Sequence, residues 1–188
     1  GLVVPVGSGL GMGDSIDPSS TTTPVQDALD TVENSGGGGA VLLPPTTVQE
    51  AKPVSFARAR IVGHGVTSSA IEFTHGGKGF VASSSRHDLS YSQIDGVTIK
   101  GQPGNRLSNA FFWDDDAGPQ TNIGQIRLQY YDTGIHTVND SPWSSHWASI
   151  YAGYGGYGPT FHFETGGMTD ITVGQVTMSN ENESTCVV

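Results

Sequence analysis

Three consecutive acidic residues form the densest carboxylate cluster in the chain, directly after the segment Phe111-Phe112-Trp113. A pair of carboxylates can supply the acid and the base of glycoside hydrolysis, and carboxylate oxygens also bind Ca²⁺. Adjacent strand residues point to opposite faces, so Asp114 and Asp116 are the candidate catalytic pair. Asp114, Asp115 and Asp116 together are candidate Ca²⁺ ligands, and no other cofactor is expected. The alternative is a solvated turn whose aspartates accept hydrogen bonds from nearby amides.

Aromatic residues gather in a glycine-rich region between residues 143 and 158. Aromatic side chains on such turns present a flat apolar face and a polar edge, which suits sugar rings and protein interfaces equally. A third interpretation is packing, with Trp147 and Ile150 inside the fold and the tyrosines covering an adjoining sheet. The candidate binding residues in this region are Trp143, His146, Tyr151, Tyr154 and Tyr157.

The other histidines are scattered along the chain without the spacing of a metal site. They include His75, His87, His136 and His162. His162 lies between two phenylalanines, and the alternation predicts that it points outward from a strand. Histidine ligands are therefore not predicted from the spacing.

Composition narrows the possible partners. The chain has 188 residues, with 18 acidic and 8 basic residues and a net charge of −10. This charge disfavours nucleic acid, because no basic patch is present to neutralise phosphates. No apolar run is long enough for a transmembrane helix, so membrane insertion is not expected. The single Cys186 excludes an internal disulfide framework.

The elements that would position these residues follow from a repeat. Apolar pairs separated by one residue recur about every 27 residues. The first series is Val41/Leu43, Ile71/Phe73, Val97/Ile99, Ile126/Leu128, Ile150/Ala152 and Val176/Met178. The second series is Val54/Phe56, Phe80/Ala82, Ala110/Phe112, Ile135/Thr137 and Phe161/Phe163. Short strands repeated at this spacing indicate a solenoid in which successive coils share one apolar interior. An antiparallel sandwich without a true repeat is the alternative.

A longer frame favours the solenoid. Apolar residues occupy the first, fourth and sixth positions of three segments, with a glycine between the first two apolar residues. The alternation of apolar residues thus shifts by one residue beside a glycine. Such a shift is expected at a bend between two strands of one coil. The three segments begin at Ile94, Ile123 and Val173.

An amphipathic helix is predicted at about residues 23–34. Thr23 and Gln26 have the spacing of a capping box, in which the Thr23 hydroxyl accepts from a backbone amide and Gln26 reaches back. Pro24 suits the first helical position. The glycines at 36–39 should end the helix. Its apolar stripe, which would cover the open end of the solenoid, consists of Val25, Ala28, Leu29 and Val32.

The run Thr23-Pro24-Val25-Gln26-Asp27-Ala28-Leu29, the glycine stretch, Ala40-Val41-Leu42-Leu43-Pro44 and Ile61-Val62-Gly63-His64-Gly65-Val66 appear in that order. This order resembles the opening of pectate-lyase-like right-handed β-helix proteins. The motifs cover about residues 20–75, and only the repeat spacing extends the resemblance further. It implies an all-β, right-handed parallel β-helix (solenoid) of about six coils with an N-terminal capping α-helix. The expected organisation is an extended arm at residues 1–22 and a β-helix domain at residues 23–188.

The resembled family includes polysaccharide lyases, glycoside hydrolases, and tailspikes and structural proteins of tailed viruses. The chain lacks the Asp-Asp plus Gly-His-Gly pattern of polygalacturonases and the Arg-x-Pro-x-x-Arg pattern of pectate lyases. The segment Gly63-His64-Gly65 lies at the structural turn of the family, so no catalytic role is carried over to it. We therefore favour a structural or host-recognition module of a virion spike or fibre or other extracellular assembly, with a glycan as its candidate ligand. The alternative is a secreted polysaccharide lyase or glycoside hydrolase.

No second capping helix is predicted after Met178. The open end is therefore expected to continue, to be covered by a partner, or to belong to an oligomer. The expected partners are further copies of the chain in a homotrimer or larger assembly and a surface glycan. The expected location is the virion or the extracellular space.

Overall fold

The computed structural model describes residues 2–7, 15–36, 38–55, 58–82, 92–113, 121–138, 145–164 and 171–178. Within these ranges the chain is mostly β, with the single helix α1 (Pro24–Asn34). The strands are β1 (Val3–Pro5), β2 (Gly39–Leu42), β3 (Thr47–Glu50), β4 (Val54–Ser55), β5 (Ala59–Val62), β6 (Ala70–Phe73), β7 (Lys78–Ala82), β8 (Ser92–Asp95), β9 (Val97–Lys100), β10 (Leu107–Trp113), β11 (Thr121–Gln129), β12 (Tyr131–Thr137), β13 (His146–Ala152), β14 (Phe161–Phe163) and β15 (Thr172–Met178).

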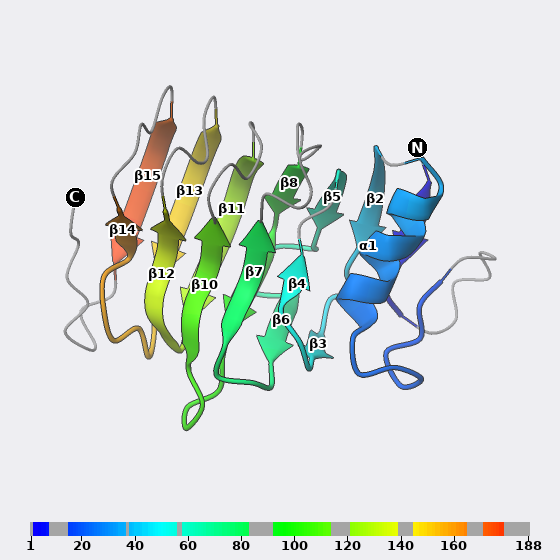
Figure 1. Cartoon of the computed structure of the whole chain (residues 1–188), viewed down its shortest axis with the longest axis horizontal. Helices are drawn as coiled ribbons and strands as arrows, with labels where there is room; N and C mark the ends of the chain where they lie inside the picture. Colours follow the sequence, from blue (N-terminus) through cyan, green and yellow to red (C-terminus); the bar gives the residue numbers. More distant parts are fainter. Residues whose placement is uncertain are drawn as a thin grey trace.

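The strands form two sheets that extend along one long axis (Figure 1). The larger sheet has ten strands, and the smaller has five in the order β14-β12-β10-β7-β4. Neighbouring strands of both sheets run parallel, as in the register of β11 with β13 and of β10 with β12. The architecture is therefore the parallel β-helix that the sequence predicts. None of the described helices is long and apolar enough to cross a membrane.

The described solenoid has about 4 turns, fewer than the six coils expected. The six apolar pairs correspond to successive strand positions along the larger sheet. Successive strands of the smaller sheet, from β4 to β14, are joined by only four circuits of the chain. The count of strand levels therefore overestimates the number of complete turns.

The columns of paired residues in the larger sheet confirm the predicted frame, although the last described strand, β15, is mostly exposed. Val97 pairs with Ile126, which pairs with Ile150, which in turn pairs with Val176. The first positions of the frame also align, because Ile94 pairs with Ile123. The early pairs belong to other columns: Val41 lies opposite Ile61, and Ile71 lies opposite Ile99. The first series thus combines neighbouring columns of one interior.

In the smaller sheet the predicted pair Ala110/Phe112 is wrong by one residue. Phe111 lies opposite Phe80, and Trp113 lies opposite Ala82. Phe111 and Trp113 are completely buried, whereas Phe112 lies opposite His136 on the next strand. A shift of one residue reverses the face of every side chain in a strand. The sequence alone does not show which of these residues face the core. Phe111, Phe112 and Trp113 are all aromatic, so both possible alternations give an apolar pair.

Stacked aromatic rings connect the two sheets through the core. Phe80 and Phe111 are stacked with centroids 5.3 Å apart, and Phe111 stacks on Trp113 at 5.4 Å. Trp113 then stacks on Trp147 of the larger sheet at 5.9 Å, and Trp147 stacks on Phe161 at 6.1 Å. Each large ring removes much apolar surface from water, so this column is a main source of stability.

The helix is confirmed at Pro24–Asn34, but its predicted capping box is wrong. The Thr23 side chain makes no capping hydrogen bond and instead donates to Asp27 Oδ1 at 3.1 Å. The Gln26 side chain donates to Asp30 and accepts from the backbone amide of Ser55. The Thr23 and Gln26 side chains therefore bond to these carboxylates and to the neighbouring strand instead of to the helix N-terminus.

Glu50 caps the helix from a distant strand. It is completely buried at an interior position of β3, opposite Phe73. Glu50 Oε2 accepts the backbone N–H of Val25 at 2.9 Å, at the start of α1. Glu50 Oε1 has no hydrogen-bond partner. A buried carboxylate thus satisfies one of the free amides at the helix N-terminus.

Candidate functional site

The outer face of the larger sheet carries polar side chains in register. Thr98 and Lys100 on β9 lie opposite Arg127 and Gln129 on β11. Arg127 lies opposite Tyr151 on the following strand. The alternation that buries Ile99 and Leu128 turns these neighbours outward. Residues about one repeat apart in the sequence therefore become adjacent on this face.

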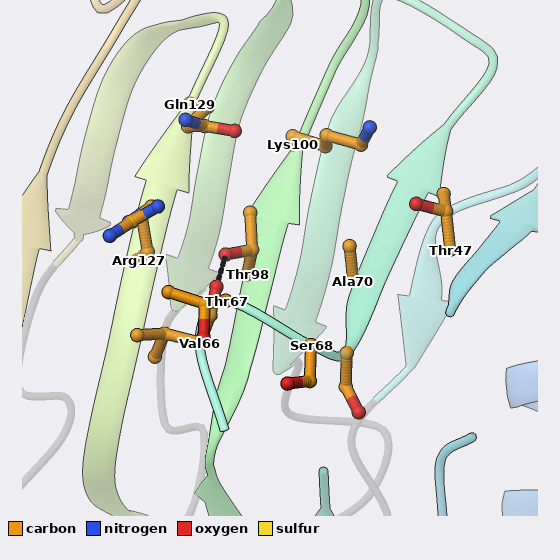
Figure 2. A pocket seen from close by; sticks show the side chains of 10 residues that line it. Thr47, Val66, Thr67, Ser68, Ala70, Thr98, Lys100, Arg127 and Gln129 are labelled. Atoms are coloured by element: carbon orange, nitrogen blue, oxygen red, sulfur yellow. Dashed lines mark hydrogen bonds between the residues drawn. The ribbon is translucent and has the colours of Figure 1, made fainter. Parts of the chain in front are cut away.

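A depression of about 220 Å³ lies on this face, where the segment that precedes β6 passes beside the sheet. Thr98 Oγ1 donates to the carbonyl of Val66 at 2.6 Å and holds this segment in place (Figure 2). Ser69 Oγ donates to the carbonyl of Pro44 at 2.7 Å. The depression, here called the sheet pocket, is lined by Thr47, Val66, Thr67, Ser68, Ser69, Ala70, Thr98, Lys100, Arg127 and Gln129.

The charge of Lys100 is balanced at the edge of the sheet pocket. Lys100 Nζ lies 2.8 Å from Glu72 Oε2. Partial burial acts to raise the pKa of Glu72, but hydrogen bonds from Lys100 and Gln102 and the charge of Lys100 outweigh it. The pKa of Glu72 is therefore lowered, and its carboxylate is ionised at neutral pH.

Arg127 differs from Lys100 because no described carboxylate balances its charge. No carboxylate in the described part of the chain lies within ion-pair distance of Arg127. Its guanidinium carbon lies 4.9 Å from the centroid of the Tyr151 ring, and its Nε is buried without a hydrogen-bond partner. A half-buried guanidinium with free donors favours an anionic ligand, above all a carboxylate that can accept two hydrogen bonds.

A second depression of about 220 Å³ contains three tyrosines and is here called the tyrosine pocket. Arg106 lies over the ring of Tyr157 at 4.5 Å and also pairs with Asp132 at 2.9 Å. Tyr130 and Tyr154 meet edge to face with centroids 5.5 Å apart. The pocket is lined by Pro103, Arg106, Tyr130, Tyr154, Gly155 and Tyr157.

Tyr130, which lines this pocket, has an unusual backbone conformation. Its φ of 51° is in the left-handed region, which few residues other than glycine adopt. Its backbone N–H donates to the carbonyl of Tyr154, and its own carbonyl accepts from Leu107. Gln129 lines the sheet pocket, and the next residue, Tyr130, lines the tyrosine pocket.

The structure separates the predicted binding residues. Tyr154 and Tyr157 share the tyrosine pocket and are 53% and 60% exposed. Tyr151 lies on the sheet face beside Arg127, and His146 is exposed at the start of β13, outside both pockets. Trp147 and Ile150 are completely buried, as the packing interpretation requires. Trp143 and the candidate residues Asp114, Asp115 and Asp116 lie outside the described residues.

Sequence reasoning missed the polar side chains that line both pockets. Lys100 and Gln129 follow the apolar pairs of β9 and β11, and Arg127 lies between the two members of its pair. Reading the outward positions of the repeat as columns would have found this group. Arg106 and Tyr130 lie in bends outside the repeated frame, so the spacing gives no signal for them.

The chain is a parallel β-helix with a polar outer face and a separate pocket of tyrosines, and comparisons with known proteins support the fold. No protein-family profile and no curated protein sequence matches the chain. Two solved structures match, both A-modules of mannuronan C-5 epimerases from Azotobacter vinelandii. AlgE4 has a TM-score of 0.60 and 19% identity over 96% of this chain. AlgE6 has a TM-score of 0.62 and 16% identity over 94%.

The chain spans 58% and 55% of the lengths of these two structures. At this level of identity the likeness concerns the fold alone. It agrees with the pectate-lyase-like β-helix to which the opening motifs point.

Proposed function

We propose that this chain is a polysaccharide-binding β-helix module of a virion spike or other extracellular assembly, and that its ligand is an acidic polysaccharide. The observation that carries the proposal is the unbalanced guanidinium of Arg127 in the sheet pocket. A uronate carboxylate would accept two hydrogen bonds from it. Lys100 and Gln129 lie beside Arg127 and offer polar groups to sugar hydroxyls.

The tyrosine pocket supports a polymeric ligand. A chain of sugars that places one carboxylate at Arg127 could extend over the bend at Tyr130 and lay another ring against Tyr154 or Tyr157. The two structurally similar proteins are named as epimerases of mannuronan, which is itself an acidic polysaccharide. This name supports the choice of a uronate ligand over a neutral sugar.

Replacing Arg127 by methionine is expected to weaken binding of mannuronan oligosaccharides by roughly 10- to 100-fold. The substitution keeps an apolar stem and removes a charge-assisted hydrogen-bond donor worth about 1.5–3 kcal/mol. Isothermal titration calorimetry with size-defined oligosaccharides measures the change, and polygalacturonate oligosaccharides test whether other uronates also bind.

The matched control is Arg60→Met, which removes an exposed arginine from β5, outside both pockets. This control should bind like the unmodified chain. Equal affinity for a neutral dextran would contradict the uronate proposal, and so would an equal loss of affinity in the two variants.

An enzymatic function is the second candidate, and the contact between Tyr151 and Arg127 favours it. Uronate lyases remove a proton next to a carboxylate, so a phenol beside a carboxylate-binding cation is a suitable arrangement. If the chain is a lyase, incubation with mannuronan or polygalacturonate should give unsaturated uronates detectable by ultraviolet absorbance. Tyr151→Phe should then lower kcat by at least about 100-fold while KM changes little.

The hydrolase alternative makes a different prediction. Asp114→Asn combined with Asp116→Asn should abolish the release of reducing ends, and activity that survives would remove both residues from the site. Absence of product with every polymer, with and without Ca²⁺, would favour binding without catalysis.

The proposed assembly is a homotrimer. Mass measurement in solution tests this state, and a monomer at micromolar concentration would contradict it.

A further inference from the structure

The outer face of the smaller sheet carries a cluster that the proposed function does not use. His136 on β12 lies opposite His162 on β14, and their rings are stacked with centroids 4.4 Å apart. Glu164 follows β14, and its Oε1 lies 2.9 Å from His136 Nε2. The potential ligand atoms of these three residues all lie within 4.8 Å of one another.

We propose that His136, His162 and Glu164 bind a divalent transition-metal ion of the Zn²⁺ class. Two imidazole nitrogens and one carboxylate oxygen form a donor set that suits Zn²⁺, Ni²⁺ and Co²⁺ and leaves a fourth position for water. Ca²⁺ and Mg²⁺ prefer sites made of oxygen ligands and should not compete. This proposal is independent of the polysaccharide proposal, because the cluster lies on the other sheet.

Side-chain rotations would bring the three donors to metal-binding distances. Zn–N and Zn–O distances of about 2.0–2.2 Å place tetrahedral donors roughly 3.3 Å apart. The His136 and Glu164 donors must therefore separate by a few tenths of an ångström, and the His162 ring must rotate out of the stack. His162 and Glu164 are partly exposed, so these rotations meet little resistance.

The hydrogen bonds around His136 identify its coordinating atom. An ionised carboxylate only accepts hydrogen bonds, so His136 Nε2 carries the proton that points at Glu164. The metal ion would displace this proton from Nε2, and Nδ1 would take up one proton from solvent in exchange, so the metal-bound imidazole stays neutral. Asn109 lies 3.2 Å from Nδ1 on the other edge of the ring. Rotation of its amide by half a turn would place Oδ1 to accept the Nδ1 proton, the usual way of orienting a metal-bound histidine.

The alternative is a purely structural contact, in which the hydrogen bond between His136 and Glu164 joins two coils without a metal. The position of the cluster alone is compatible with either role. The difference lies in His162, since the structural contact needs only its stacked ring, whereas the metal site needs its nitrogen.

The test uses the full chain without an affinity tag, freed of metal with a chelator and then dialysed. Titration with Zn²⁺ should give one site per chain with a micromolar Kd, and Co²⁺ should give visible absorption bands of a coordinated ion. Zn²⁺ should also raise the melting temperature, because it binds only the folded chain. His162→Phe, which keeps a stacked ring but removes the nitrogen, should weaken Zn²⁺ binding by at least about tenfold.

The matched control is His64→Ala, which removes an exposed histidine far along the chain and should leave Zn²⁺ affinity unchanged. His136→Gln and Glu164→Gln should weaken binding as His162→Phe does. The proposal is overturned if the chain binds no Zn²⁺ at one equivalent, if His162→Phe binds as tightly as the unmodified chain, or if Ca²⁺ displaces Zn²⁺. Circular dichroism of each variant confirms that it is folded before binding is compared.

Discussion

Replacing Trp147 by alanine is expected to lower the free energy of unfolding by about 3–5 kcal/mol. Trp147 is completely buried between Trp113 and Phe161, and its Nε1 donates to the carbonyl of Thr121 at 3.2 Å. The substitution would open a cavity, remove two stacked contacts and leave a carbonyl without its donor. Unfolding by urea, followed by far-ultraviolet circular dichroism, measures the loss.

The control for this prediction is Tyr154→Ala. Tyr154 is 53% exposed, so its removal should change the free energy of unfolding by no more than about 0.5 kcal/mol. Coils of a solenoid contact only their neighbours, so hydrogen exchange in Trp147→Ala should accelerate in β11, β13 and β14 more than in α1. Uniform acceleration along the chain would contradict this local account.

The buried Glu50 is expected to make stability depend on pH. Burial raises its pKa from 4.5 to about 7, although hydrogen bonds from the Val25 and Gln26 amides act in the opposite direction. The folded state therefore binds the proton more tightly than the unfolded state. This contribution is complete below about pH 4.5 and is lost as the pH rises through about 7. The loss is on the order of 3 kcal/mol, since one pKa unit corresponds to about 1.4 kcal/mol.

Comparison with Glu50→Gln isolates this contribution. Glutamine resembles the protonated acid, keeps an oxygen for the Val25 amide and does not ionise. The difference in unfolding free energy between the variant and the unmodified chain should therefore grow in favour of the variant between pH 4.5 and 7.5. Exposed Glu33 supplies the control, as Glu33→Gln should show little change with pH. A difference for Glu50→Gln that stays constant over this range would refute the assignment.

The repeated frame of the larger sheet could be predicted because its physical cause is visible in the sequence. Each coil must supply apolar residues to the shared interior at the same positions, so Ile94 and Ile123 recur with the same neighbours. The capping helix was also predictable, since its apolar stripe is local and a glycine run follows it. The helix signal is local, and the frame is a short pattern that each coil repeats, so both can be found in the sequence.

Other features depend on partners that the local sequence does not reveal. Glu50 caps a helix 25 residues earlier, so no capping motif near Thr23 could indicate it. The phase of Phe111 is ambiguous among its aromatic neighbours and is decided only by pairing with Phe80. In both cases contact with a neighbouring coil overrides the local pattern.

The histidines show how a visible repeat can still be misread. His136 and His162 were treated as scattered, yet each is the middle residue of a predicted pair in the second series, Ile135/Thr137 and Phe161/Phe163. Their stacking follows directly from that register. Arg127 likewise lies between the two apolar members of its pair, but its surroundings depend on Tyr151 in the next coil. Outward columns have to be examined together before their chemistry becomes apparent.

The stacked indoles of Trp113 and Trp147 also provide an optical signal within the solenoid. Their rings come from different sheets, with centroids 5.9 Å apart and planes 27° apart. Two indoles this close couple their electronic transitions, which should give a paired band in near-ultraviolet circular dichroism. The band would disappear when the two sheets separate, even if each strand kept its backbone hydrogen bonds. Spectroscopy without any added dye could therefore follow the opening of the interior separately from the loss of β-structure.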